Sequence, residues 1–226
     1  MLQLLRQSMI RSWLTCPAEY YQRYELGIEQ PFTPALELGT HYHKEVERYH
    51  LGKPYDEQLI APYTEVVQPI TGELIEHSFT YIPIHPVFGT KLDIPFTGTI
   101  DRVNPSMALT DFKTSSSSWS QTKAHKALPD LTGWYPETSG LQATAYCMYW
   151  WQEHGEVLPF DFVVLRKDRK KNGDIYPVKT IRTTRSIDNF AMFFDLCEQI
   201  ITDIQNETEW LCTCINQTHV LEETIK

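Results

Sequence analysis

Several features that would assign a function at once are missing from this sequence. No stretch resembles a signal peptide, and no hydrophobic run is long enough to span a membrane unbroken. A glycine-rich phosphate loop of the kind that helicases and other nucleotide hydrolases carry is also absent. These absences predict a cytoplasmic protein with no membrane partner, and any ATP-driven step would have to come from another chain.

Cysteine is scarce, and its number is odd. Five cysteines without a secretory signal predict a reducing compartment rather than a disulfide framework. With 42% hydrophobic and 22% charged residues, the composition is that of a soluble globular protein rather than a disordered one. At 226 residues the chain is long enough for one well-buried α/β domain and short for two, so we expect residues 1–226 to form a single domain.

Basic side chains are outnumbered by acidic ones. The formal net charge of −9 argues against a surface built as a whole to grip duplex DNA, because non-specific affinity scales with the phosphates that lysine and arginine neutralise. A local strip of basic residues can still guide a DNA strand. Residues 166–171 form one such strip, which leads into the favoured hairpin turn Asn172-Gly173. A sparser strip contains Lys123, His125 and Lys126. Each strip is either a phosphate contact or a solvated loop.

The most informative segment is Thr97–Thr114, which carries two acids on neighbouring apolar stretches. Turn residues separate the two stretches, so the segment predicts a β-hairpin. Alternate side chains of a strand share a face, so Asp111 and Lys113 point the same way, and strand pairing brings Asp101 alongside them. Mg²⁺ and Mn²⁺ prefer carboxylate oxygens, and a nearby ammonium can position water and offset charge on a phosphate. The pattern predicts either a metal-dependent phosphodiesterase centre or a surface hairpin with a solvated ion pair.

Two helical patterns carry further polar residues. The first spans about residues 38–51, with Thr40 in a plausible capping position, and the second follows Gly140. Each pattern brings two side chains four residues apart onto one face, His43 with Glu47 and Gln142 with Tyr146. Such side chains could contact a phosphate, a base or the attacking water.

Four short motifs in this order make the chain resemble the RecB-like branch of the PD-(D/E)XK nuclease superfamily over about residues 10–150. They are a histidine motif ending at His43, an acidic motif at Asp101, an acid-x-Lys motif at 111–113 and a Gln-x-x-x-Tyr motif at 142–146. The resemblance implies an α/β, restriction-endonuclease-like core with a central mixed β-sheet flanked by helices. It also implies a DNA nuclease that depends on Mg²⁺ or Mn²⁺.

The resemblance further implies a role for each motif residue. His43, Asp101 and Asp111 would hold the metal, with the Phe112 carbonyl as a further ligand. Lys113 would orient the nucleophilic water. The residues expected to act in catalysis are Asp101, Asp111, Lys113, Gln142 and Tyr146, of which the last two would contact substrate or steady the lysine.

Many relatives of that branch hold an iron-sulfur cluster with one cysteine of an N-terminal helix and three cysteines near the C-terminus. The counterparts in this chain are Cys16, Cys212 and Cys214, and no third cysteine follows. Four thiolates are the usual requirement, so a cluster would need a non-cysteine fourth ligand or an inward-turned Cys197. The alternative is a nuclease without a cluster, in which Cys147 and Cys197 are small buried hydrophobes.

Three functions stay open at this point. RecB-like relatives commonly act on single-stranded DNA ends, which favours an exonuclease in recombination, repair, or phage or CRISPR DNA processing, with a helicase or recombination protein as a partner. The first alternative is a catalytically silent or partner-dependent nucleic-acid-binding module with a nuclease fold. The second is a zinc hydrolase that uses His41 and His43, although residues two apart on a helix do not face one another. The sequence leaves the oligomeric state open.

The remaining segments complete the expected organisation. We expect one helix over about residues 2–26, β-rich material over 74–112, a strand at 160–165, a returning strand at 175–180 and an amphipathic helix over 187–206. The segment between residues 115 and 140 shows no clear periodicity and contains Trp119, Trp134 and Tyr135. These aromatic rings would either stack on single-stranded bases or fasten the loop to the core.

Overall fold

A six-stranded mixed β-sheet is the centre of the computed structural model, which describes residues 2–29, 31, 33–104, 108–115, 126, 139–167, 171 and 176–207. The strands are β1 (Leu5–Arg6), β2 (Leu74–Tyr81), β3 (Phe96–Asn104), β4 (Ala108–Ser115), β5 (Phe160–Arg166) and β6 (Lys179–Thr183). Their order is β1-β3-β4-β5-β6, with β2 also paired to β3. The β1–β3 and β4–β5 pairs are parallel and the others antiparallel. The predicted α/β class with a central mixed sheet is confirmed.

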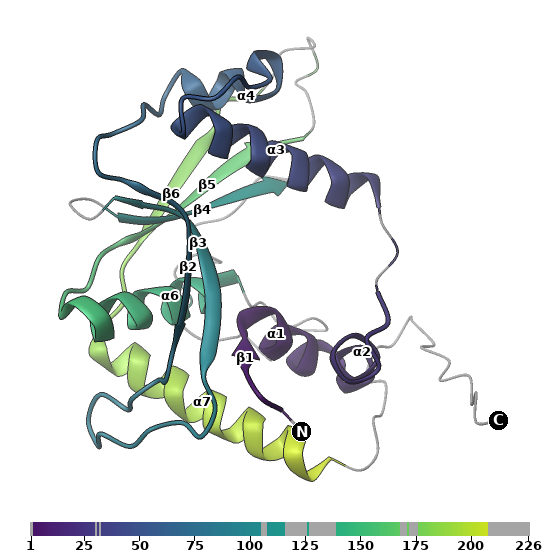
Figure 1. Cartoon of the computed structure of the whole chain (residues 1–226), viewed down its shortest axis with the longest axis vertical. Coiled ribbons are helices and arrows are strands. Elements are labelled where there is room, and N and C mark those ends of the chain that lie inside the picture. The colour runs from purple at the N-terminus through teal and green to yellow at the C-terminus, as the bar shows by residue number, and fades with distance from the viewer. Residues whose placement is uncertain are drawn as a thin grey trace.

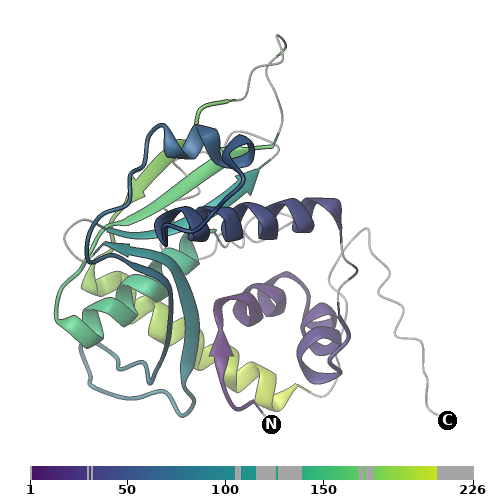
Figure 2. The same cartoon turned by 45° about the horizontal axis from the view of Figure 1, so that its top comes forward.

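Helices cover both faces of this sheet (Figures 1 and 2). On one face lie α3 (Pro34–His50) and α4 (Glu57–Thr64), and on the other lie α6 (Ser139–His154) and α7 (Ile187–Asn206). The N-terminal helices α1 (Gln7–Thr15) and α2 (Pro17–Tyr20) and the π-helical turn η1 (Tyr21–Glu25) follow β1 on the side of α6 and α7. None of the helices in the described ranges is both long and apolar enough to cross a membrane.

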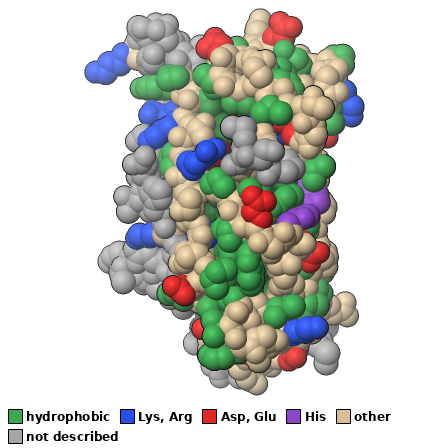
Figure 3. Space-filling view, turned by 90° about the vertical axis from the view of Figure 1, so that its left-hand side faces the viewer, with side chains coloured by type: hydrophobic (Ala, Val, Ile, Leu, Met, Phe, Trp, Pro, Cys, Tyr) green, Lys and Arg blue, Asp and Glu red, His purple; other side chains and the backbone are tan. Residues whose placement is uncertain are grey.

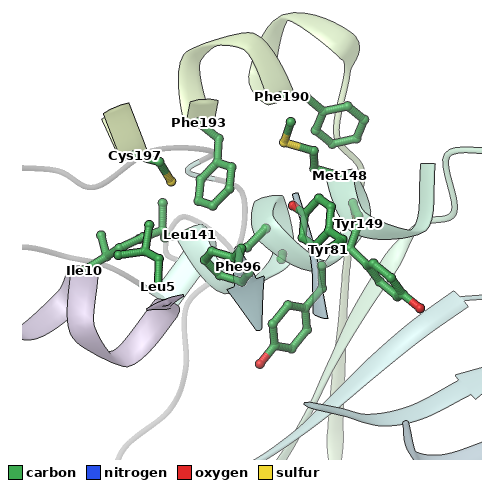
Figure 4. Close-up of a cluster of buried hydrophobic side chains, with 14 of the residues drawn as sticks. Leu5, Ile10, Tyr81, Phe96, Leu141, Met148, Tyr149, Phe190, Phe193 and Cys197 are labelled. Atoms are coloured by element: carbon green, nitrogen blue, oxygen red, sulfur yellow. The ribbon is translucent and has the colours of Figure 1, made fainter. Parts of the chain in front are cut away.

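Two hydrophobic clusters hold the layers together. The larger cluster joins the sheet to α1, α6 and α7, and Figure 4 shows Ile10, Leu141 and Phe193 converging on Phe96 of β3. The smaller cluster joins the sheet to α3 and α4 through residues such as Tyr42 and Phe112. Burying one large apolar side chain contributes about 1.5–3 kcal/mol, so both clusters contribute to holding the helices against the sheet.

The last helix matches its prediction at both ends. Ser186 caps α7, because its side chain accepts a hydrogen bond from Asn189 N while the Asn189 side chain accepts one from Ser186 N. The predicted apolar stripe is buried along its whole length. It consists of Phe190, Phe193, Phe194, Cys197, Ile200, Ile201 and Ile204.

The prediction of one N-terminal helix over residues 2–26 is wrong. Leu5–Arg6 forms a strand that pairs with Phe96–Thr97, and α1 then ends at Thr15, followed by Cys16 in an extended conformation with a φ of −162°. Pro17 explains the break, since proline has no backbone N–H and restricts the preceding residue to extended conformations. The chain therefore enters the fold as a strand followed by separate short helices.

The histidine helix begins earlier than predicted. Thr33 caps α3 by accepting a hydrogen bond from Leu36 N at 3.2 Å, and Pro34 occupies the first helical position. Thr40, predicted as the cap, lies inside the helix, where its hydroxyl donates to Leu36 O at 3.1 Å. Elsewhere, α4 is a helix that was not predicted from the sequence, and its Asp56 cap accepts hydrogen bonds from Gln58 N and Leu59 N.

The returning strand also differs from its prediction. It was expected at residues 175–180 and is found at Lys179–Thr183, paired antiparallel with β5. The Asn-Gly turn thought to precede it lies outside the described residues. The strand's direction is thus as predicted, while its position is shifted along the chain.

One edge of β3 is split between two partners. β2 pairs along the whole of the other edge, from Leu74 opposite Val103 to Tyr81 opposite Phe96. On the split edge, β4 pairs at 102–104 and β1 pairs at 96–97. Within the described residues, no strand pairs with positions 98–101 on this edge, and β3 curves away from β4 there (Figure 1). The split opens the sheet beside Asp101.

Candidate active site

The hairpin of β3 and β4 brings the two predicted acids together. Arg102 pairs with Thr110, so the same register sets Asp101 opposite Asp111. The carboxylate of Asp101 accepts a hydrogen bond from Phe112 N at 2.6 Å, in the region where the ladder has opened. The two residues are 8% and 2% exposed, so both carboxylates are largely withdrawn from water.

Lys113 and Gln142 close a triangle of polar contacts around Asp111. The Lys113 ammonium lies 2.7 Å from Asp111 Oδ2 and donates to Gln142 Oε1 at 2.9 Å. Gln142 Nε2 in turn donates to Asp111 Oδ1 at 2.6 Å. We call these three residues the polar triangle. The ammonium donates a hydrogen bond to Gln142 and is ion-paired with Asp111, and the lysine side chain is 31% exposed, so donor capacity is left for water or substrate.

Tyr146 supports the triangle from the next turn of α6. Its hydroxyl hydrogen-bonds the Gln142 side chain and the Thr99 backbone. Burial raises the pKa of Tyr146, so the phenol stays neutral near pH 7. The tyrosine therefore ties α6 to the unpaired stretch of β3 and fixes the orientation of Gln142.

His43 reaches the acids from α3 on the other face of the sheet. Its Nδ1 lies 3.4 Å from Asp101 Oδ2, and it hydrogen-bonds the Phe112 backbone. The imidazole packs against the Phe112 ring with centroids 6.0 Å apart. Burial lowers the pKa of His43, so the ring is neutral near pH 7, the form in which histidine binds metals.

The two carboxylates are electrostatically undercompensated. Burial and the neighbouring Asp111 raise the pKa of Asp101 well above its usual range. Asp111 Oδ2 is buried and accepts no hydrogen bond from the described residues, although the Lys113 ammonium lies beside it. A divalent cation would supply the missing positive charge. Within the described residues, however, no three His, Cys, Asp or Glu side chains are arranged to hold an ion by themselves.

The described part of the chain offers no support for the zinc alternative. His41 is exposed and lines a cavity with Pro34 and Glu37, whereas His43 faces Asp101. The two imidazoles thus lie on different sides of α3, as helical geometry requires.

The three predicted cluster cysteines are only partly described. Cys16 is completely buried at the junction of α1 and α2, while Cys212 and Cys214 lie outside the described residues. The iron-sulfur cluster therefore stays a prediction. Cys147 and Cys197 are buried within the larger hydrophobic cluster, as free cysteines in apolar patterns were expected to be.

Few of the predicted basic and aromatic contacts can be located. Arg166 lies over the Tyr176 ring at 4.1 Å, and Lys167 donates to the Ala35 carbonyl at 2.9 Å, so these two cations contact protein. Lys171 is exposed. The following predicted residues lie outside the described ranges: the rest of the 166–171 strip, Lys123, His125, Trp119, Trp134 and Tyr135.

Glu76 is a site residue that sequence reasoning missed. Ile75 pairs with Arg102 and His77 with Ile100, so Glu76 falls opposite Asp101 on β2. Its φ of +51° is the one positive value among the described non-glycine residues. Such backbone strain persists where the surrounding structure enforces it, often at functional sites. No local pattern could have revealed Glu76, because its position depends on the register of β2.

Two openings flank the polar triangle. The first, which we call the hydroxyl groove, has a volume of about 420 Å³ and lies between the start of α1 and the unpaired stretch of β3. The second, the α3 cavity, has a volume of about 600 Å³ and lies between α3, β2 and the end of β4. The groove includes Arg6, Ser8, Ser78, Thr97, Thr99 and Tyr146 in its lining, and the cavity includes Leu36, Thr40, His43, Glu47, Glu76 and Thr114.

Similarity to known proteins is found in structure and not in sequence. No family model matches the chain, and no curated protein matches it. The crystal structure of a candidate exonuclease from Eubacterium rectale matches with a TM-score of 0.56 at 15% identity, covering 99% of this chain and 91% of that one. The chain therefore shares its overall fold with that structure.

A second match involves LHK-Exo, crystallised in complex with dAMP. It has a TM-score of 0.46 at 16% identity and covers 89% of this chain and 87% of that one. At these identities the matches concern the fold alone. They do not single out the RecB-like branch, which stays a prediction.

Proposed function

We propose that this protein is a metal-dependent DNA nuclease that degrades single strands from their ends. The observation that carries the proposal is the polar triangle of Asp111, Lys113 and Gln142 beside Asp101, at the point where the β3 edge is split. The shared fold with a candidate exonuclease supports the same reading. Cleavage of DNA and its restriction to strand ends are both part of the proposal.

Asp101 and Asp111 are the proposed holders of Mg²⁺ or Mn²⁺, with His43 and the Phe112 carbonyl next to them. Magnesium is usually bound by one or two carboxylates together with waters and substrate phosphates, so a site without three protein side-chain ligands suits it. Asp111 Oδ2 is buried and accepts no hydrogen bond from the described residues, so it can offer a lone pair to such an ion. When bound, the ion would polarise the phosphate and favour deprotonation of water.

Lys113 is the proposed positioning group for the attacking water. Among the described residues its ammonium donates one hydrogen bond, to Gln142, and is ion-paired with Asp111, and the side chain is partly exposed. The ammonium can therefore hold a water near the phosphate and offset the negative charge that grows there in the transition state. Gln142 keeps the lysine in place, and Tyr146 keeps Gln142 in place.

The hydroxyl groove is the proposed contact for the DNA backbone. It contains Arg6 and the first residues of α1, whose N-terminus has no side-chain cap. Uncapped backbone N–H groups and a guanidinium both favour phosphate oxygens. Ser78 and Thr99 add hydroxyls that are 3.0 Å apart. Among the described residues, Lys and Arg are scattered over the face in Figure 3, so a local phosphate contact matters more than a basic surface.

The proposal is tested by incubating purified protein with end-labelled linear single-stranded DNA and with a covalently closed single-stranded circle. We expect Mn²⁺ or Mg²⁺ to support stepwise shortening of the linear strand, while the circle stays intact and EDTA stops the reaction. Cleavage of the circle would make the protein an endonuclease. Binding of DNA without cleavage of either substrate under any divalent metal would overturn the proposal in favour of a binding module.

A further inference from the structure

The polar triangle lies between two openings that differ in their walls. Tyr146 and Thr99 connect the triangle to the hydroxyl groove, while His43 and Thr114 connect the same centre to the α3 cavity. The two openings therefore offer room for substrate on either side of a phosphate placed at the triangle.

The two openings also differ in charge. The described residues lining the hydroxyl groove include Arg6 and no acid. The α3 cavity contains Glu47 and Glu76, whose carboxylates accept no hydrogen bond from the described residues, together with Lys44. Like charges in a partly buried space repel one another strongly. The cavity therefore disfavours a phosphate and offers acceptors to a neutral group that carries N–H or O–H donors.

The shape of the α3 cavity suits a nucleoside. Its volume of about 600 Å³ falls within the range of about 300–1,000 Å³ that small-molecule sites occupy. Leu36 gives the cavity an apolar surface and is 52% exposed, so this surface is accessible. A Cβ on Gly39 would lie 3.3 Å from Thr114 Oγ1, which shows that α3 and β4 approach closely along one wall.

We propose that the α3 cavity receives the nucleoside that adjoins the scissile phosphate, with its base against Leu36. Glu47 and Glu76 accept hydrogen bonds from the base or sugar, and the phosphates on the other side of the cleaved bond lie along the hydroxyl groove. The inference rests on the proposed nuclease function and specifies which part of the substrate each opening binds. It predicts that the enzyme recognises a base at one position relative to the cleaved bond.

The test uses a set of oligonucleotides that each carry a single abasic residue at a successive position from the end. We measure kcat/KM for the bond next to each abasic residue. We expect kcat/KM to fall about tenfold at one position adjoining the cleaved bond, in keeping with the loss of one base-stacking contact. Equal cleavage of every abasic oligonucleotide would overturn the inference.

Two leucine variants test whether the base is recognised in the α3 cavity. Leu36→Ala removes the apolar wall, whereas Leu51→Ala changes a leucine of similar exposure, 46%, at the far end of the same helix. We expect Leu36→Ala to reduce the abasic effect to about twofold and Leu51→Ala to leave it unchanged. Retention of the full effect in Leu36→Ala would contradict the inference. If wild-type protein leaves even the unmodified strand uncut, the proposed function itself fails, and the inference fails with it.

Discussion

Replacing Gly98 with alanine is expected to disturb the candidate active site through a single methyl group. The new Cβ would lie 2.8 Å from Tyr146 Cε1 and 2.9 Å from Phe79 Cζ, which is closer than such atoms can approach. Phe79 has little room to move, because it stacks on Tyr149 with ring centroids 3.9 Å apart. The displacement therefore falls on Tyr146, which orients Gln142.

The size of the effect follows from the packing. Adding a methylene to a well-packed core typically costs about 1–3 kcal/mol, and both rings next to Gly98 are nearly buried, so we expect a loss of about 2 kcal/mol. For a chain of this length such a loss lowers Tm by about 4–8 °C. We expect the kcat of cleavage to fall, because the displaced tyrosine loosens Gln142, and KM to rise as well, because Tyr146 also lines the hydroxyl groove.

Urea unfolding and steady-state cleavage measure the two effects. Gly39→Ala is a matched control, because its Cβ would meet a single side-chain atom, Thr114 Oγ1, at 3.3 Å, a tight contact that a shift of a few tenths of an ångström relieves, and alanine favours the helix interior by up to about 1 kcal/mol. We expect Gly39→Ala to be as stable as the wild type or more so. Wild-type stability and kcat in Gly98→Ala would refute the reasoning.

The remaining predictions concern buried charges. Burial and the neighbouring Asp111 raise the pKa of Asp101 in the folded protein above its value of about 3.9 in the unfolded chain. At a pH between these two pKa values, the native state holds a proton on Asp101 that the unfolded chain has lost. Metal-free protein should therefore gain stability as pH falls from 7 toward 4, and Asp101→Asn should weaken this trend in urea titrations at each pH. The Glu73 carboxylate bridges His50 of α3 at 2.6 Å and Arg102 of β3 at 2.7 Å. We therefore expect Glu73→Gln to lower the free energy of unfolding by about 3 kcal/mol. An unchanged urea midpoint would exclude this bridge as a stabilising contact.

The orientation of the motif residues within each element could be predicted because it depends on local periodicity. Strand alternation sets Asp111 and Lys113 on one face, and helical spacing sets Gln142 beside Tyr146. The helix over 187–206 could be predicted for the same reason, since its apolar stripe repeats at the helical period. In each case, neighbours in sequence decide which way a side chain points.

Features that depend on distant pairing could not be predicted. β1 consists of two residues, and its identity as a strand comes from pairing with Phe96 and Thr97 across the fold. Glu76 and the two openings exist only once β2 is in register with β3. The break at Pro17 and the start of α3 at Thr33-Pro34 are different, because local proline signals at both places could have located them.

The measurement that tests the central claim most directly is single-turnover cleavage of linear single-stranded DNA with Mn²⁺ by Lys113→Ala, beside wild type and Lys91→Ala. Lys91 is an exposed lysine remote from the triangle in sequence and serves as the matched control. We expect Lys113→Ala to lose cleavage while it stays folded under assay conditions, and Lys91→Ala to cleave normally. Full cleavage by Lys113→Ala, or its unfolding under assay conditions, would contradict the assignment of this lysine to the catalytic centre.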